Sequence, residues 1–291
     1  MSKILSVYKK ITELRQKYYQ LAQNKQALLK MIGEAEIAEQ VYNSNAIENS
    51  TLTLEETEKI LLQIDLDRYI NERELFEARN LARVVDYINN KAKDQELNID
   101  IILFMHKTLL SNIRDDVAGR FRKENEWVKV ANHIGAAPEI ITKKMNDTLM
   151  EYQATQNENI IKRISLLHLR FENIHPFVDG NGRLGRAINN YLLIREGFVP
   201  INIKFIDRAQ YYQAFREFDS TKQTNTMEEI VGKALINSYH KRIAYLEGLE
   251  IITLNDYAKK KQLSHSNLIN KAHRQTIEAF WEKGIWKIGL K

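Results

Sequence analysis

The scarcity of proline and glycine constrains the fold of this chain more than any other feature of its sequence. Only three Pro and eleven Gly occur among its 291 residues. Proline ends or kinks helices and glycine favours turns, so a chain with few of either can form long helices with few tight turns. We therefore expect an all-α protein.

The composition excludes several kinds of chemistry. The chain has no Cys, which rules out disulfides, thiolate metal sites and cysteine nucleophiles. No run approaches 18 apolar residues, and the opening MSKILSVYKKITELRQ lacks the apolar core of a signal peptide. We expect a cytoplasmic protein that has no membrane partner.

The net charge of +5 is concentrated at one end of the chain. Residues 251–291 hold eight Lys and Arg against three acidic residues, whereas the other 250 residues are balanced. A separable basic segment favours a nucleic acid or an acidic molecule as the partner of this tail.

Apolar residues spaced three and four apart predict helices along most of the chain. One helix is expected over residues 1–42, and its pattern breaks at NSNAIENS. Thr53 and Glu56 have the spacing of a capping box, which predicts that the next helix begins there. Pro176 and Gly197 are each expected to end a helix. Further helical segments are predicted at about 70–95, 98–112, 139–157, 160–174, 184–197, 207–217 and 226–247.

The segment EWVKVANHI, Glu126–Ile134, interrupts the helical pattern. It alternates loosely, carries β-branched and aromatic residues, and precedes Gly135 and Pro138. We expect a short hairpin or an extended flap there.

The stretch HPFVDGNGRLGR, His175–Arg186, lies between two of the predicted helices. Its Gly-Asn-Gly segment comes just before the second helix, where backbone N–H groups and the helix dipole favour anions. Arg183 and Arg186 are three apart, so we expect them to project from one face and to clamp a polyphosphate.

Two further side chains complete a site for phosphorus chemistry. Asp179 is placed to hold Mg²⁺ that bridges phosphate oxygens. His175, a residue type with an ordinary pKa of about 6.5, can take a proton from an attacking hydroxyl. These groups together indicate transfer of a phosphorus centre from a nucleotide to a hydroxyl. The alternative is a helix N-cap loop with surface arginines, which the length of the string disfavours.

This stretch resembles the signature of the Fic family of nucleotidyltransferases, His-x-Phe-x-Asp/Glu-Gly-Asn-Gly-Arg-x-x-Arg, at every fixed position. The resemblance implies the Fic helical bundle and transfer of AMP from ATP to a Ser, Thr or Tyr hydroxyl of a target protein, with release of pyrophosphate. It makes His175 the base, Asp179 the Mg²⁺ ligand and Phe177 the anchor of the loop. The resemblance implies that phosphate is contacted by Gly180, Asn181, Gly182, Arg183 and Arg186. Of these residues, Arg186 is implied to hold the γ-phosphate. Doc-type kinases replace part of Gly-Asn-Gly-Arg, so the intact segment favours AMP transfer over phosphorylation.

The resemblance extends to both sides of the motif. GRFR, Gly119–Arg122, and the WVKVANHI that follows resemble the family's flap, which pairs with the backbone of the target. The flap residues expected to do so are Val128, Lys129 and Val130. DRAQYYQAF resembles the segment whose Tyr lines the adenine pocket, which makes Tyr211 and Tyr212 candidates; aromatic packing in the core is the alternative.

SNAIEN, Ser44–Asn49, resembles the family's inhibitory motif, Ser/Thr-x-x-x-Glu-Gly/Asn, which precedes the catalytic core in class II members. The resemblance gives Ser44, Glu48 and Asn49 an inhibitory role. A glutamate beside the active site can pair with Arg186 and remove the γ-phosphate clamp, which leaves the α-phosphate of ATP misplaced. An exposed loop acid is the alternative for Glu48. By analogy with members that reverse AMPylation, it could also position a hydrolytic water for de-AMPylation.

The basic tail has the spacing of a helix-turn-helix. TLNDYAKKKQLSHSNLINKAH contains two short apolar patterns, with Ser264 as a candidate N-cap and Gln262 where the turn glycine is usual, and AFWEKGIWKIG is a candidate wing. Lys271 and Arg274 on the second helix suit phosphate contacts. A small packing or target-docking module is the other interpretation, and both stay open.

We expect three parts in the chain. Residues 1–95 form an N-terminal helical region with the inhibitory motif, 96–248 a Fic catalytic core with a hairpin flap, and 249–291 a small winged-helix or helix-turn-helix-like domain. The predicted function is that of a self-inhibited protein adenylyltransferase that uses ATP and Mg²⁺. A DNA-binding regulator that senses nucleotide, or an interaction module with a vestigial site, are the rivals. The resemblance also implies a homodimer through the core, although the sequence does not specify the oligomeric state.

Overall fold

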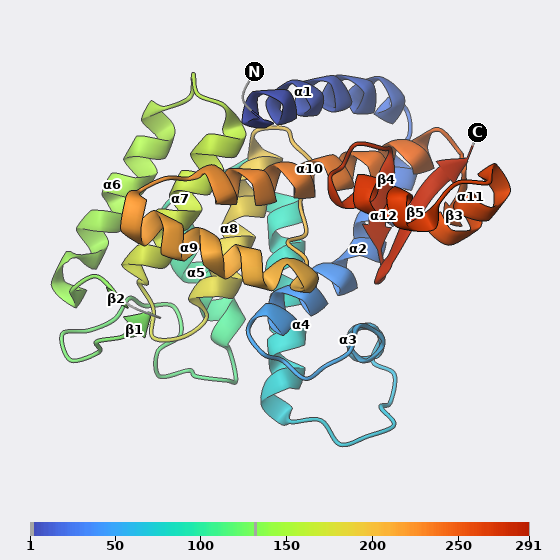
Figure 1. The fold of residues 1–291 in the computed structure, drawn as a ribbon. Coiled ribbons are helices and arrows are strands. Elements are labelled where there is room, and N and C mark those ends of the chain that lie inside the picture. Colours follow the sequence, from blue (N-terminus) through green and yellow to red (C-terminus); the bar gives the residue numbers. More distant parts are fainter. Residues whose placement is uncertain (1–2, 131–132, 291) are drawn as a thin grey trace.

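The computed structural model describes residues 3–130 and 133–290. Within these ranges most residues are helical, which confirms the all-α prediction. Figure 1 shows helices α7 and α8 surrounded by other helices, with a small sheet at the C-terminal side. Among the residues described, no helix is both long and apolar enough to cross a membrane.

The helices and strands follow one another along the chain. The α-helices are α1 Lys3–Ala22, α2 Gln26–Ile47, α3 Leu54–Leu61, α4 Glu72–Lys91, α5 Ile99–Leu110, α6 Ile141–Ala154, α7 Ile160–Ile174, α8 Asn181–Arg195, α9 Arg208–Thr221, α10 Asn225–Leu246, α11 Leu254–Lys261 and α12 His265–His273. Two 3₁₀ turns are η1 Pro138–Ile140 and η2 Phe205–Asp207. The strands are β1 Lys129–Val130, β2 His133–Ile134, β3 Glu250–Thr253, β4 Ala279–Glu282 and β5 Ile285–Leu290.

Several helix ends lie where the sequence predicts them. Thr53 caps α3 by accepting from the backbone N–H of Glu56, whose side chain accepts from the N–H of Thr53, so the capping box is present. Helix α7 ends at Ile174, ahead of Pro176, and α8 ends before Gly197, which has a φ of 73°. The helical prediction is therefore most accurate where side-chain caps, proline or glycine mark the ends.

The prediction of one helix over residues 1–42 is wrong in two respects. The chain turns after α1 at Asn24, which has a φ of 59°, and asparagine tolerates this left-handed conformation. Helix α2 then continues through the expected break as far as Ile47. Residues 43–47 at its C-terminal end are buried, and Asn43 among them is bonded on both sides: its amide donates to the carbonyl of Glu39, and its oxygen accepts from the N–H of Phe205. These tertiary partners stabilise a segment whose local sequence favours a turn.

One hydrophobic cluster extends from Ile11 to Ile243 and includes the motif loop. Helices α7 and α8 pack against each other at its centre, and α10 packs against α1, α7 and α9. A second, smaller cluster lies within the C-terminal segment, where Leu254 and Leu268 pack with Trp286. The three-part division predicted from the sequence stays a prediction.

The C-terminal segment is a strand, two short helices and a hairpin. Its sheet is antiparallel with the strand order β3-β5-β4. Ser264 caps α12 by accepting from the N–H of Asn267, as expected, and Gln262 ends α11 with a φ of 54° in place of a glycine. The candidate wing, AFWEKGIWKIG, forms the β4–β5 hairpin.

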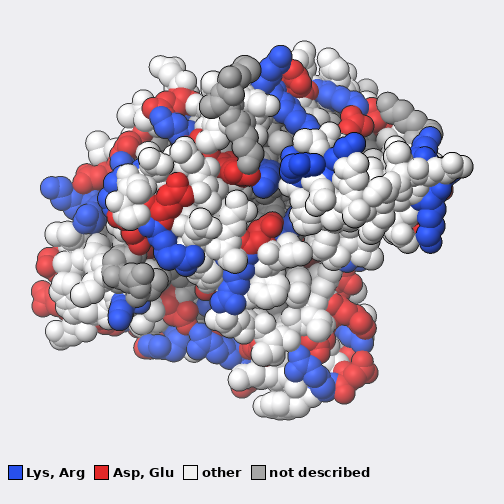
Figure 2. Space-filling model, viewed as in Figure 1, with Lys and Arg blue, Asp and Glu red and all other residues white. Residues whose placement is uncertain are grey.

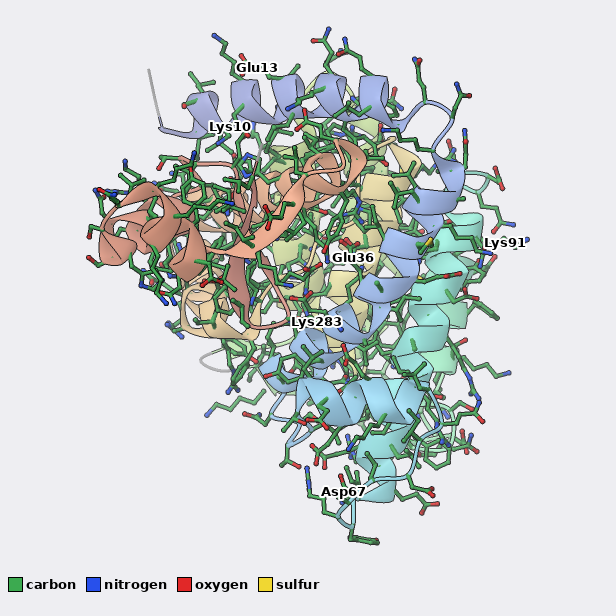
Figure 3. The ribbon with its side chains drawn as sticks, turned by 90° about the vertical axis from the view of Figure 1, so that its right-hand side faces the viewer. Lys10, Glu13, Glu36, Asp67, Lys91 and Lys283 are labelled. Carbon is green, nitrogen blue, oxygen red and sulfur yellow. The ribbon has the colours of Figure 1, made fainter. Side chains whose placement is uncertain are left out.

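Buried ion pairs join this C-terminal segment to α2 and α10. Lys241 of α10 lies 2.7 Å from Glu282 of β4 and 3.4 Å from Glu36 of α2, and Arg242 also contacts Glu36. The side chains of Lys241, Glu36 and Glu282 are each at most 10% exposed. Figure 3 labels Glu36 and, at the tip of the hairpin, Lys283, whose N–H donates to Glu39 of α2. Helix α2 is thus held by charges near its middle.

We expect Lys241→Met to lower the free energy of unfolding by about 3–5 kcal/mol, because it leaves Glu36 and Glu282 buried with less opposite charge. Chemical denaturation measures this loss. Lys233→Met is the matched control on the same helix, since Lys233 pairs with Glu229 nearer the surface, and it should cost less than about 1 kcal/mol. Equal losses in the two variants would contradict the interpretation.

Candidate active site

The motif predicted to bind phosphate forms the loop between α7 and α8 and the first turns of α8. His175 follows α7 with φ 50° and ψ 63°, a left-handed conformation that turns the chain out of the helix. Gly180 precedes α8 with a φ of 81°, and a Cβ there would lie 2.9 Å from Leu110. Both the conformation and the space therefore require glycine at this position.

Three side chains hold this loop against the core. Phe177 is fully buried, and its ring stacks on His106 with the centroids 3.8 Å apart. The Asn181 amide accepts from the N–H of Phe177 at 3.0 Å and donates to its carbonyl at 2.9 Å. His106 accepts from the N–H of Gly119 through Nδ1, so its Nε2–H donates to the carbonyl of Asp179. Asn181, predicted to contact phosphate, thus uses its side chain to fix the loop.

Arg122 connects the predicted flap to the same loop. Its guanidinium donates to the carbonyls of His175, Glu126 and Ala136, and its N–H donates to the carbonyl of Pro176. The flap prediction is confirmed as a hairpin, with Lys129 opposite Ile134. Figure 1 shows this hairpin beside the loop that joins α7 to α8. Of the predicted flap span, residues 131–132 lie outside the described part of the chain.

Arg186 on α8 is buried and bonded on several sides. Its Nε donates to Ser44 Oγ at 2.9 Å, and Nη2 donates to the Ser44 carbonyl at 2.8 Å and to Glu48 Oε1 at 2.9 Å. Nη1 donates to the hydroxyl of Tyr211 at 3.2 Å. Four of the five N–H donors of the guanidinium are therefore used by groups of this chain. The structure thus brings Ser44 and Glu48 onto the motif arginine.

Glu48 also lies directly over the Gly-Asn-Gly segment. A Cβ at Gly182 would clash with Glu48 Oε1, so any larger residue there would force the carboxylate to shift. Asn49 follows with a φ of 71°, which asparagine tolerates, and its side chain accepts from Arg208 of α9 at 2.7 Å. The carboxylate of Glu48 therefore lies beside the backbone that was predicted to receive phosphate.

Arg183 and Arg186 border one pocket with Ser44, but they pair with different acids, so the expectation that both are free to clamp phosphate stays a prediction. Arg183 is nearly buried, 2.9 Å from Glu77 of α4 and 3.3 Å from Asp179. Arg73 of α4 also binds Asp179, at 2.6 Å. Residues three apart on a helix differ by about 60° in direction, and here Glu77 of α4 attracts one arginine, while Ser44 and Glu48 bind the other. Of the two arginines, Arg186 is the one bonded to Glu48.

A cavity of about 520 Å³ lies where these segments meet. It is bordered by residues from α2, the flap, α7, the motif loop, α8 and α9. Those that the sequence singled out are Glu48, Val130, His175, Gly182, Tyr211 and Tyr212. Tyr211 is almost fully buried, with its hydroxyl between Arg186 and His168, whereas Tyr212 is half-buried and its hydroxyl donates to the carbonyl of Ile47. The positions of the two tyrosines thus support both interpretations, lining of an adenine pocket and aromatic packing in the core.

Sequence reasoning missed two buried titratable residues beside this cavity. Burial, and then the charge of Glu48, raise the pKa of Glu172 to about 8, while Arg186 opposes the change. Burial, with a contribution from Arg186, lowers the pKa of His168 to about 3. Both lie on α7 at spacings that mark its buried face, so helical periodicity could have identified their burial but not their neighbours.

Asp179 is the residue that could hold Mg²⁺. Burial works to raise its pKa, but Arg183 and Arg73 outweigh it and hold that pKa below the usual value of an aspartate. Within the residues described, no three His, Asp or Glu side chains cluster as a metal-ligand set. A single carboxylate suits Mg²⁺ that takes its other ligands from phosphates and water. The fit also requires that Arg73, which is half-exposed, release the carboxylate.

Comparison with known families agrees with this geometry. Residues 96–193 match the model of the Fic/DOC family, a span that includes the hairpin, α7 and the whole motif. The chain therefore carries a Fic/DOC family domain. The Fic domain contains the cavity residues from the flap to α8, whereas α2 and α9 come from sequence on either side of it.

The curated relatives that this chain matches carry a functional name. The chain is 32% identical to "Protein adenylyltransferase Fic" of Nematostella vectensis over 70% of its own length and 48% of the relative. It is 31% identical to "Protein adenylyltransferase fic-1" of Caenorhabditis briggsae over 70% of its length and 40% of the relative. The chain thus spans half or less of the length of these relatives.

Solved structures share the fold. A fragment of Fic-1 from C. elegans is 26% identical, with a TM-score of 0.74 over 84% of this chain and 73% of that one. A Fic-domain protein from Bacteroides thetaiotaomicron, 24% identical, has a TM-score of 0.74 over 82% of this chain and 97% of that one. The helical Fic fold predicted from the motif is therefore confirmed.

The two amide–backbone bonds of Asn181 generate a stability prediction. We expect Asn181→Ala to lower the free energy of unfolding by about 2–4 kcal/mol, because the buried N–H and carbonyl of Phe177 each lose their partner. Thermal and chemical denaturation measure the change. Asn90→Ala, at an exposed position of α4, is the control and should change stability by less than about 0.5 kcal/mol. A loss of that small size for Asn181→Ala would show that other contacts hold the loop.

Proposed function

We propose that this protein transfers AMP from ATP to a hydroxyl of a target protein and releases pyrophosphate. The observation that carries the proposal is the cavity in which His175, Gly182 and the flap residue Val130 meet at the N-terminus of α8. Backbone N–H groups at a helix N-terminus favour phosphate, and an imidazole at the same wall can accept a proton. The name that the curated relatives carry supports the same reaction.

In the proposed reaction each group has one task. His175 takes the proton of the target hydroxyl, whose oxygen forms a bond to the α-phosphorus while the bond from that phosphorus to pyrophosphate breaks. The flap residues Val128, Lys129 and Val130 pair with the target backbone and hold the hydroxyl near the imidazole. Asp179 would hold Mg²⁺, which neutralises phosphate charge when it is bound. Tyr211 and Tyr212 border the space proposed for adenine.

We propose that the protein as it stands is inhibited by its own α2. The donors of Arg186 that a γ-phosphate would need are engaged with Ser44 and Glu48, and the Glu48 carboxylate repels phosphate at Gly182. Asn49 lets the chain turn away directly after the glutamate. A second role for Glu48 is to position water for removal of AMP from a modified target, the alternative activity for the same cavity.

We expect Glu48→Gly to raise transfer of AMP on the order of 10²-fold, because ATP can then bind with its α-phosphate in line with the hydroxyl. Incubation with ATP labelled at the α-phosphate, followed by mass spectrometry of the modified protein, measures the rate and identifies the nucleotide. Ser44→Ala removes one bond to Arg186 and should give a smaller rise. Glu55→Gly on α3 is the control and should leave transfer unchanged.

The double variant His175→Ala, Glu48→Gly tests the role of His175 as the base in a protein that lacks the inhibitory glutamate. Transfer should fall to background, since no other group is proposed to take the proton. Persistent transfer in that double variant would exclude His175 as the base. Transfer that is no faster in Glu48→Gly than in the unaltered protein would exclude self-inhibition by Glu48.

A second proposal concerns the C-terminal segment, which we infer binds nucleic acid through α12. Leu268 and Ala272 face the small core, whereas Asn267, Lys271 and Arg274 are exposed. Figure 2 shows Lys and Arg side chains in a run along the outer edge of the C-terminal segment. An exposed polar and basic helix face beside a hairpin suits contacts to phosphates and base edges.

We expect duplex DNA of random sequence to bind at low salt, with an affinity that falls as salt rises, because phosphate contacts release counterions. An electrophoretic shift assay across salt concentrations measures this. Lys271→Glu should weaken binding by about tenfold or more, whereas Lys143→Glu, an exposed position on α6, should have little effect. Equal effects of the two variants, or absence of a shift, would leave the protein-docking alternative.

A further inference from the structure

Glu172 lies one helical turn before His175, and the inference about its role rests on the proposed function. It is 8% exposed, and its Oε2 lies 3.8 Å from Nδ1 of His175. That distance is longer than a hydrogen bond, and contacts in an active site without substrate often tighten when substrate binds. A carboxyl at one ring nitrogen leaves the other nitrogen for the cavity, which His175 borders.

The surroundings of Glu172 limit where its carboxyl can go. Its Oε1 is 2.7 Å from the position that a Cβ at Gly185 would take, so the glycine inside the motif provides the space for this carboxyl. The charged or titratable groups that face it come from four elements. They are Glu48 of α2, His168 of α7, His175 after α7, Arg186 of α8 and Tyr211 of α9.

These neighbours determine whether the carboxyl carries a proton. Burial, and then the negative charge of Glu48, raise the pKa of Glu172 to about 8, so the carboxyl is mostly protonated at pH 7 in the inhibited arrangement. Loss of the Glu48 charge removes one of the two causes that raise this pKa. The carboxyl is then ionised over a wider range, extending to lower pH.

We propose that Glu172 is a positioning residue for His175, which selects the tautomer and stabilises the protonated form of its imidazole, and that Glu48 suppresses this action. An ionised Glu172 accepts a hydrogen bond from Nδ1–H, which leaves the lone pair of Nε2 free for the target hydroxyl. A protonated Glu172 instead donates to Nδ1, which puts the hydrogen on Nε2 and prevents it from taking another proton. Glu48 thus acts twice, on Arg186 and on the base.

The hydroxyl proton moves to Nε2 as its oxygen bonds to the α-phosphorus, and pyrophosphate leaves with the electron pair of the broken bond. The imidazolium that results keeps its Nδ1–H, whose charge the Glu172 carboxylate compensates. The two arrangements differ in the protonation state of Glu172 and, with it, in the tautomer of His175.

Nuclear magnetic resonance of ¹⁵N-histidine protein at pH 7 tests the tautomer without requiring transfer activity. The His175 signals are identified as those that disappear in His175→Ala. We expect Nε2–H in the unaltered protein, changing to Nδ1–H above about pH 8, where Glu172 ionises. Glu48→Gly should show Nδ1–H already at pH 7. A tautomer that is the same in both proteins across this pH range overturns the proposal.

Kinetics in the Glu48→Gly background provide the second test. Glu172→Gln keeps the shape but not the charge, so kcat should fall by about tenfold or more, and the acid limb of the kcat/KM profile should move to lower pH, while KM for ATP stays within about twofold. Glu158→Gln, at an exposed position just before α7, is the control and should leave the profile unchanged. A fall in kcat with an unmoved profile indicates a merely structural role and overturns the proposal. Absence of transfer in Glu48→Gly itself instead refutes the proposed function, while the tautomer measurement still decides the role of Glu172.

Discussion

The buried guanidinium of Arg186 is the group around which the site is organised. A charge of this kind is stable away from water only when most of its donors are bonded, and Ser44, Glu48 and Tyr211 provide those bonds from two other helices. The same interaction locates α2 against α8, closes one wall of the cavity and puts a carboxylate over Gly182. A single ion pair therefore couples the position of α2 to the state of the phosphate segment.

Helix α2 is held by charges at its middle and at its C-terminal end. Its middle carries Glu36 and Glu39, which bind α10 and the C-terminal segment, and its C-terminal end carries Ser44 and Glu48 at the cavity. With a rise of 1.5 Å per residue, Glu36 and Glu48 lie about 18 Å apart along the helix axis. The C-terminal segment and the cavity are thus both bound to one helix.

Much of the site could be predicted because its chemistry is contiguous in sequence. His175, Asp179 and the Gly-Asn-Gly segment follow one another, so their relation is set by local geometry, and glycine at position 180 meets a conformational need that the string itself reveals. Arg183 shows the limit of this reasoning. Its spacing from Arg186 predicted a shared phosphate clamp, but Glu77 of α4 attracts it, and no local rule indicates where α4 lies. The continuation of α2 past Asn43 has the same cause, since buried partners outweigh the local preference for a turn.

The sequence by itself determined the helical class, the capped and proline-marked helix ends, the hairpin flap and the motif loop, because these depend on residues close together in the chain. Only the tertiary structure decided that Glu48 lies on Gly182, that Arg73 and Arg183 engage Asp179, and that Glu172 is buried beside His175. Those contacts depend on how helices pack across long separations and on the low dielectric between them. Burial of this kind changes which charged groups meet and which protons they hold, and no single segment of sequence specifies it.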